Sequence, residues 1–383
     1  MMSNMNRTMQ EAMRLMQTGD LRAATKAIQR GLGAGTEPAC GTSKTRVSDL
    51  AADCIEGQYR VVPDNSDDGV KMPGTTEAPA NEPSGRPGGE FSDHRFTCDA
   101  GAMRYKLFVP AGLSAAMPPL LVMLHGCTQS PDDFARGTRM NALAQEHGYV
   151  VAYPAQSRSK NAQKCWNWFR SHDQQRGQGE PAIIAALTRQ LVKSHGLDER
   201  RVYVAGLSAG GAMAAVLAST YSDVYAAIGV HSGLPVGAAR DLPSAFAAMK
   251  QGAGGPSAGV PPAHRDPVPA IVFHGDRDIT VDPSNGAAII AQCIGTTPAV
   301  LETQPDGTRA TVEHASVPGG RAYTRTIFRN ADGSVAAEQW VIHGGGHAWF
   351  GGDPAGSYTD PSGPDASENM LRFFSACAHP AIN

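Results

Sequence analysis

The sequence predicts an α/β fold, in which a mostly parallel sheet carries helices on both faces. Short apolar runs such as 120–124 and 270–273 are typical of strands buried on both sides. Helical stretches such as 180–195 alternate with them along the chain. Polar residues follow several of the strands directly, and ligands of such folds bind beyond the carboxyl ends of the strands. We therefore expect the functional residues in the turns that follow the strands.

The stretch 201–218 carries the strongest local signal. A β-run at 202–204 leads into Gly206-Leu207-Ser208-Ala209-Gly210, and a helix of small residues follows. G-x-S-x-G between a strand and a helix is the nucleophile elbow of the α/β-hydrolase fold. Glycines are needed there because a Cβ on either side of the strained serine would crowd the neighbouring strand and helix. A chance match in a chain rich in Gly, Ser and Ala is the alternative; the context favours Ser208 as nucleophile.

The other elements are expected in a regular order around this elbow. The globular body should begin near His94 with a hairpin that turns at 99–101. Residues 233–268 are rich in Gly, Ala and Pro, so they predict a long insertion over the strand ends, with a helical island at 245–250. Further strands are expected at 120–124, 149–153, 226–230, 270–273 and 338–342, and helices at 134–147, 180–195, 285–294 and 366–376.

A serine needs a base to remove its proton and an acid to orient that base. In this fold the order along the chain is serine, acid, histidine. Asp276 and Asp278 both follow the strand 270–273, and Asp278 is preferred because it lies further along the turn, toward the histidine loop. His347 follows the last strand through three glycines and is the expected base. A metal site made by His343 and His347 is a weak alternative, so no metal and no cofactor are expected.

The oxyanion of the reaction needs two backbone N–H donors. One is expected from Ala209, just after the nucleophile, and the other from Cys127 in the loop after 120–124, with Thr128 as the next candidate. His125 is expected to hold that loop. Cys127 and Cys165 could lie near each other under the site, although two reduced thiols are the simpler expectation for a cytoplasmic protein.

Composition excludes several classes of function. The chain has 383 residues with 41% hydrophobic and 18% charged residues, as in ordinary globular proteins. A net charge of −3 gives no reason to expect a nucleic acid or an acidic membrane surface as partner. No apolar run approaches the ~20 residues of a membrane span, and no secretory signal is visible. We therefore expect a cytoplasmic location, with export by a non-Sec route as the alternative.

Three segments are expected along the chain: a helical hairpin at 1–35, a flexible linker at 36–92 and the catalytic domain at 93–383. The linker region is dense in Pro, Gly, Ser and acids and offers little to bury. Met9, Met13 and Met16 share one face of the first helix. A methionine face is adaptable and could contact a hydrophobic granule surface, although packing within the chain is the commoner role.

The combined motifs HGCTQ, CWNWF, RGQGEPA, GLSAGGAM, HSGLPVGAA, HGDRD and GHAWFGG resemble the esterases of the poly(3-hydroxybutyrate) depolymerase family, which also includes feruloyl and acetylxylan esterases. The resemblance covers roughly 94–378. It implies Ser208 as nucleophile, Asp278 as acid and His347 as base. It also implies that Trp166, Trp168 and Trp349 lie near the site as substrate-binding walls; plain core packing is as good a reading for each of them.

The expected function is therefore a serine carboxylesterase that hydrolyses polymeric or oligomeric 3-hydroxyalkanoate esters. A feruloyl or acetylxylan esterase with the same triad is the alternative. A different class, an inactive protein of the granule surface, is disfavoured by the complete Ser–Asp–His set.

Overall fold

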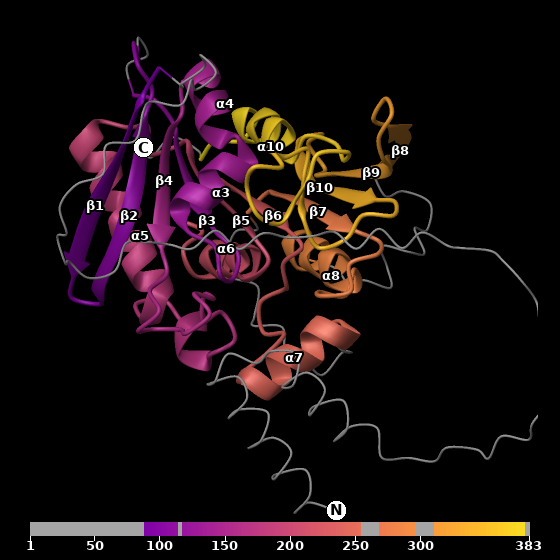
Figure 1. The fold of residues 1–383 in the computed structure, drawn as a ribbon, viewed down its shortest axis with the longest axis horizontal. Helices are drawn as coiled ribbons and strands as arrows, with labels where there is room; N and C mark the ends of the chain where they lie inside the picture. The colour runs from indigo at the N-terminus through magenta and orange to yellow at the C-terminus, as the bar shows by residue number, and fades with distance from the viewer. Residues whose placement is uncertain (1–87, 114–116, 254–267, 296–309, 380–383) are drawn as a thin grey trace, which may run out of the picture. The chain divides into compact units, whose positions relative to one another are not determined.

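A ten-stranded sheet forms the centre of the computed structural model, which describes residues 88–113, 117–253, 268–295 and 310–379 (Figure 1). Its strands lie in the order β1-β2-β4-β3-β5-β6-β7-β10-β9-β8. A separate pair, β11 (Trp349–Phe350) and β12 (Thr359–Asp360), lies outside this sheet. The strands of the large sheet are β1 (Glu90–Cys98), β2 (Gly101–Val109), β3 (Leu120–Leu124), β4 (Val150–Ala155), β5 (Val202–Leu207), β6 (Ala227–His231), β7 (Ala270–Gly275), β8 (Ala310–Ser316), β9 (Ala322–Arg329) and β10 (Val335–Ile342).

The middle of the sheet is parallel and its two margins are antiparallel. Strands β4, β3, β5, β6, β7 and β10 run in one direction. The hairpin β1–β2 adds to β4, and β9 and β8 add to β10, all antiparallel. The carboxyl ends of β3, β5, β7 and β10 therefore meet at one edge of the sheet, named the catalytic edge because the residues expected to be catalytic follow these strands.

Helices cover both faces of the sheet, as the alternating pattern predicts (Figure 1). Helices α5, α6 and α8 pack on one face, and α3, α4 and α10 on the other. Helix α7 and the short 3₁₀ helix η1 stand in the connections. The bounds are α3 (Pro131–Thr138), α4 (Met140–His147), η1 (Ser171–Gln174), α5 (Gly179–His195), α6 (Ala209–Thr220), α7 (Leu242–Gln251), α8 (Ser284–Cys293) and α10 (Ala366–Ser375).

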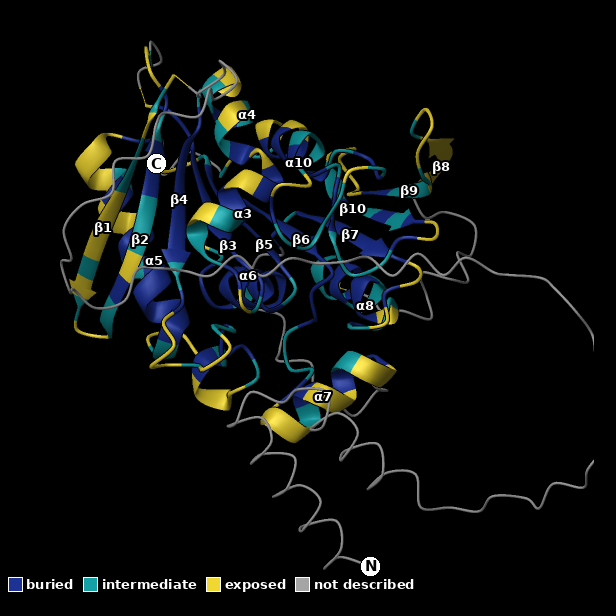
Figure 2. Cartoon of the chain, viewed as in Figure 1, coloured by how far each residue is buried: buried dark blue, intermediate teal, exposed yellow. Residues whose placement is uncertain are grey.

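Burial follows the position of each strand in the sheet. Every residue of β3, β5, β6 and β7 is buried, because helices cover both sides of these strands. The margin strand β1 is largely exposed (Figure 2). Two apolar cores result, one on each face of the sheet.

The structure differs from the expected elements in a few places. The expected helix 134–147 is two helices, because Arg139 takes a left-handed conformation (φ 55°) between α3 and α4. Strand β1 starts at Glu90, a little before the expected start of the body. Short strands β11 and β12 were not expected. The hairpin expected at 1–35 and nearly all of the linker expected at 36–92 lie outside the described residues.

Candidate active site

Ser208 stands at the turn between β5 and α6, at the catalytic edge. Its backbone has φ 56° and ψ −117°, a combination that residues with a Cβ rarely adopt. The backbone N–H donates to the carbonyl of His231 at 2.8 Å, which holds the turn against β6. Serines at helix starts usually cap the helix with the hydroxyl, but this side chain makes no capping bond. The hydroxyl is therefore left for other chemistry.

The two glycines of G-x-S-x-G have the steric role that the sequence predicts. A Cβ on Gly210 would lie 2.0 Å from the carbonyl oxygen of Leu124, the last residue of β3. A Cβ on Gly206 would lie 2.4 Å from the backbone of Gly210. The strand, the turn and the helix can approach this closely only without those side chains.

Asp278 and His347 come together at the catalytic edge from the turns after β7 and β10. His347 Nδ1 and Asp278 Oδ2 are 2.7 Å apart. The Asp278 side chain is fully buried, whereas that of His347 keeps 11% of its surface exposed. Asp278 Oδ1 accepts the backbone N–H groups of Thr280 and Val281, both at 2.9 Å. These bonds fix the carboxylate so that its second oxygen orients the histidine ring.

The surroundings of Asp278 keep its carboxyl group ionised. Burial by itself raises the pKa of a carboxyl group. The hydrogen bonds from His274 and His347, the positive charge of His347 when protonated, and the N–H of Val281 outweigh burial and hold the pKa of Asp278 far below its usual range. An ionised partner favours the tautomer of His347 that carries its proton on Nδ1 and leaves Nε2 free to accept a proton.

A second aspartate–histidine pair lies beside the first, and it is the outer one. His343 Nδ1 and Asp276 Oδ2 are 3.0 Å apart, and Asp276 Oδ1 accepts the N–H of Gly344 at 2.7 Å. Both side chains are over a third exposed. Asp278, the aspartate preferred from the sequence, thus belongs to the buried pair and Asp276 to the exposed one. It also gives His343 and His347 different aspartates, which does not fit the alternative metal pair.

The loop after β3 carries Cys127, the residue expected to donate to the oxyanion. The N–H of Thr128 already donates to the carbonyl of Gln163 at 2.7 Å, which removes Thr128 as a candidate. Within the residues that the structure describes, the N–H groups of Cys127 and Ala209 have no hydrogen-bond acceptor. His125 holds this loop: its Nδ1 donates to the carbonyl of Gly126 at 2.8 Å, and its Nε2 accepts the N–H of Gln156 at 3.1 Å. Burial lowers the pKa of His125 to about 4, so the ring is neutral at pH 7.

Cys127 and Cys165 form a disulfide, which corrects the expectation of two reduced thiols. Their Cα atoms are 4.2 Å apart. The bond ties the oxyanion loop to the loop that follows β4, and Trp166 adds a hydrogen bond from its indole N–H to the carbonyl of His125 at 3.0 Å. The two loops are thereby a single unit.

Glu180, in the first turn of α5, holds the loop that follows β4. Sequence reasoning missed this role. Its buried carboxylate accepts the backbone N–H of Asn167 at 2.8 Å, the side-chain amide of Asn167 at 2.5 Å and a bond from the Gln156 amide. Burial raises the pKa of Glu180. A single carboxylate in the first turn of a helix matches no general motif. The one signal was that Glu180 lies in RGQGEPA, a run that resembles the family.

The three tryptophans expected as substrate walls are buried instead. Trp166, Trp168 and Trp349 expose 0%, 5% and 1% of their surface. Trp349 stacks on His231 and donates its indole N–H to Ser367 at 3.0 Å. These tryptophans therefore pack in the core, because a buried ring cannot contact a substrate.

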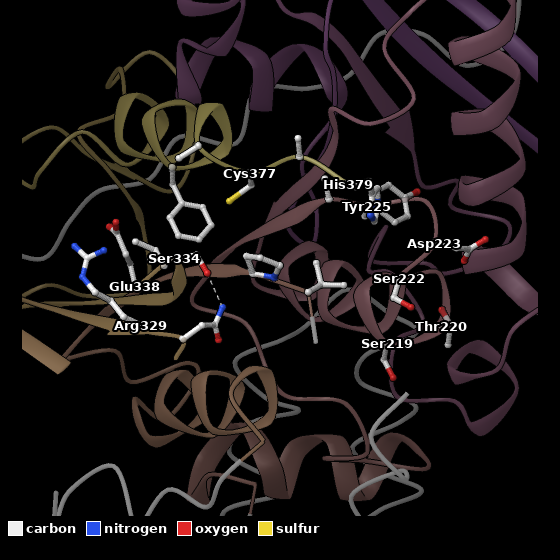
Figure 3. A pocket seen from close by; sticks show the side chains of 18 of the residues that line it. Ser219, Thr220, Ser222, Asp223, Tyr225, Arg329, Ser334, Glu338, Cys377 and His379 are labelled. Carbon is white, nitrogen blue, oxygen red and sulfur yellow. Dashed lines mark hydrogen bonds between the residues drawn. The ribbon is translucent and has the colours of Figure 1, made fainter. Parts of the chain in front are cut away.

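A cavity of about 1470 Å³ lies away from these residues, at the amino ends of β6 and β7 (Figure 3). Glu338 lies in its lining and is paired with Arg372 and Arg325 at 2.6 and 2.9 Å. Asn330 and Ser334, which also line the cavity, are hydrogen-bonded to each other; the dashed line at Ser334 in Figure 3 marks this bond. None of Ser208, Asp278 and His347 lines this cavity, so it is separate from the catalytic edge.

Two further observations concern the described residues alone. No helix in those ranges is long and apolar enough to cross a membrane. The same ranges hold no group of three or more His, Cys, Asp or Glu side chains arranged to bind a metal ion.

A family model and several similar proteins point to the same family of esterases. The family model described as Esterase PHB depolymerase matches residues 103–313. Poly(3-hydroxyalkanoate) depolymerase C of Paucimonas lemoignei is 34% identical over 260 residues, which is 66% of this chain and 60% of that protein. Probable acetylxylan esterase A of Aspergillus clavatus is 31% identical over 193 residues, or 47% of this chain and 61% of that protein. Feruloyl esterase B of Thermothelomyces thermophilus is 34% identical over 140 residues, or 36% and 47%.

The chain thus spans about three fifths or less of the length of these relatives. Among solved structures, the acetyl xylan esterase from Aspergillus awamori matches 74% of this chain and 99% of its own, with a TM-score of 0.55 and 20% identity. That likeness shows the fold, an α/β-hydrolase.

Proposed function

The chain belongs to the esterase PHB depolymerase family, and from this premise we propose that it is a serine esterase that hydrolyses 3-hydroxyalkanoate esters, as oligomers or as polymer. The observation that carries the proposal is the 2.7 Å contact between Asp278 and His347 at the sheet edge where Ser208 stands on its strained turn. These are the parts that acyl transfer through a serine requires.

The reaction proceeds in two halves. The Ser208 hydroxyl oxygen attacks the ester carbonyl carbon while Nε2 of His347 takes its proton. The oxyanion that forms is bound by the N–H groups of Ala209 and Cys127. His347 then gives the proton to the leaving alkoxide, and an acyl-enzyme remains. A water molecule gives a proton to Nε2 of His347 and attacks the acyl carbonyl carbon; the bond to the Ser208 oxygen breaks, His347 returns the proton to that oxygen, and the acid is released.

Apolar surface beside the acid favours a hydroxyalkanoate over a sugar ester. Ile279, next to Asp278, keeps 84% of its surface exposed. Leu242 and Phe246 are exposed on α7, and Lys250 of the same helix donates to the carbonyl of Ile279 at 2.6 Å. Helix α7 and the acid turn are therefore in contact, and each carries exposed apolar side chains, which suits a substrate made of short aliphatic units. The 34% identity to a depolymerase points the same way.

A panel of esters tests the proposal. Rates are measured for wild type and Ser208→Ala on 3-hydroxybutyrate oligomers, amorphous polymer, p-nitrophenyl esters of increasing chain length, methyl ferulate and acetylated xylan. The proposal expects the hydroxybutyrate esters to be the best substrates and the serine variant to be inactive on all. A preference for acetylated xylan or methyl ferulate would select the alternative with the same triad.

Contact with a granule surface is proposed for the methionine face of 5–32, which lies outside the described residues. Replacing Met9, Met13 and Met16 by glutamate should lower the rate on amorphous granules and leave the rate on a soluble p-nitrophenyl ester near wild type. Equal effects on both substrates would reject the contact.

The Cys127–Cys165 disulfide favours the alternative of an exported protein over the expected cytoplasmic location, because disulfides persist in oxidising compartments. Fractionation of native cells, with alkylation of free thiols before mass spectrometry, tests this proposal. Cytoplasmic protein with both thiols alkylated would reject it.

A further inference from the structure

A cationic groove lies at the catalytic edge, next to the oxyanion loop. It encloses about 710 Å³. Gln129 and Ser130, which follow the oxyanion loop, form part of its lining, as does Ala155, the last residue of β4. Arg104 of β2 is in register with Ala155, so the groove continues from the oxyanion loop onto the β1–β2 hairpin.

The charge of this groove is strongly unbalanced, in a chain whose net charge is −3. Six basic side chains and two carboxylates line it. Both carboxylates are taken up by one of the bases: Lys106 Nζ lies 2.5 Å from Asp132 and 3.5 Å from Asp93. Arg95, Arg104, Arg158 and Lys160 belong to the same lining, outside the pairs that Lys106 makes.

Two of these bases are directly opposed. Arg95 and Arg104 are cross-strand partners in the antiparallel pair β1–β2. Like charges directly opposite each other destabilise a sheet. Within the ranges that the structure describes, neither they nor Arg158 has a carboxylate partner. The arrangement is therefore costly to the fold and suited to an anionic ligand.

We propose that this groove binds the carboxylate of an anionic ester substrate while Ser208 attacks an ester bond further along the same molecule. The inference rests on the proposed function. Its chemistry is that of the free carboxyl end of a 3-hydroxyalkanoate oligomer, which is ionised at neutral pH. A uronic acid on a xylan chain offers the same group.

The position of the groove sets which bond is cut. Strand β4 is two strand spacings from β5 and β2 is three, so the carboxylate lies about 10 to 14 Å from the nucleophile along the sheet edge. One hydroxybutyrate unit adds four chain atoms, or roughly 4.5 Å when extended, by the scale of a peptide chain. The fragment that leaves with the carboxylate should therefore contain two or three units.

The test compares a 3-hydroxybutyrate tetramer as free acid with its methyl ester, which carries no charge. The measured quantity is the selectivity, kcat/KM for the free acid divided by kcat/KM for the methyl ester. Arg104→Gln combined with Arg158→Gln should lower it about tenfold, since each exposed charge contact contributes up to about fivefold. Lys193→Gln is the matched control: Lys193 is exposed near the end of α5, outside the groove. It should keep the wild-type selectivity.

The dependence on ionic strength and the length of the products are two independent measurements. Raising the ionic strength to about 0.5 M should lower the selectivity of the wild type, because salt screens exposed charges. Wild type should release mainly dimer and trimer with the original carboxyl end. Selectivity that is equal in wild type and the double variant would overturn the groove proposal, even if the tetramer is hydrolysed well.

A second arm separates the two sources of the carboxylate. Acetylated xylans with and without uronic acid groups are compared in the same variants. A charge-dependent loss on the uronic polymer alone would keep the groove, assign it to xylan and overturn the proposed hydroxyalkanoate substrate. Failure of the wild type to hydrolyse any hydroxybutyrate ester would overturn the proposed function itself.

Discussion

Replacing Asp278 with asparagine tests the geometry of the candidate triad. Oδ1 of this side chain accepts two backbone N–H groups, from Thr280 and Val281. The oxygen of an asparagine must stay there, because an amide NH₂ cannot accept those bonds. The new NH₂ group then takes the position 2.7 Å from Nδ1 of His347. Nδ1 must accept, the ring proton moves to Nε2, and the histidine offers a donor where a base is needed.

The wrong tautomer should lower kcat by about 10⁴-fold, the scale found when a triad aspartate is replaced in this way. The assay is the steady-state hydrolysis of p-nitrophenyl butyrate at pH 7 to 8, with circular dichroism to show that the variant is folded. Asp276→Asn is the matched control. It changes the exposed pair with His343 and should cost no more than a few-fold. A larger loss in Asp276→Asn than in Asp278→Asn would refute the assignment.

Three further predictions concern stability and the elbow. Cys127→Ala with Cys165→Ala opens a loop with a sequence separation of 38 and should lower the free energy of unfolding by about 3 to 4 kcal/mol; denaturant unfolding measures it, and a variant as stable as wild type would contradict it. The hydrogen bond from Arg176 lowers the pKa of Asp223 to about 2, so the stabilisation is present above pH 4 and disappears as the pH falls toward 2. Asp223→Asn should therefore lower the Tm at pH 7 and leave it unchanged at pH 2, and a loss of equal size at both pH values would contradict this. Gly210→Ala should abolish hydrolysis and destabilise the fold, because its Cβ would lie 2.0 Å from a carbonyl oxygen of β3; an active, stable variant would show that the elbow tolerates a side chain.

The sequence was sufficient to predict the elements whose residues are adjacent along the chain. The elbow needs a strand, two glycines and a helix in succession, and all of them fall between 201 and 218. The buried strands read as apolar runs because helices cover both of their faces. The break at Arg139 was missed because this residue is neither a glycine nor a proline, although its backbone is left-handed (φ 55°).

Contacts between distant segments were harder to predict. The order along the turn favoured Asp278 over Asp276, but the pairing of its carboxylate with His347, 69 residues later, follows from how the turns after β7 and β10 meet. The disulfide depends on how the loop after β4 folds back onto the loop after β3. Trp349 shows a further limit, since an aromatic residue near a site motif serves the core as readily as the substrate.

The central claim is that Ser208 is the nucleophile, and covalent labelling tests it most directly. The full chain is treated with a fluorophosphonate, digested and mapped by mass spectrometry, beside Ser208→Ala. We predict one adduct, on Ser208, together with loss of hydrolysis by at least about 10⁴-fold in the variant. An adduct on another residue, or a variant that keeps more than about a tenth of the wild-type rate, would contradict it.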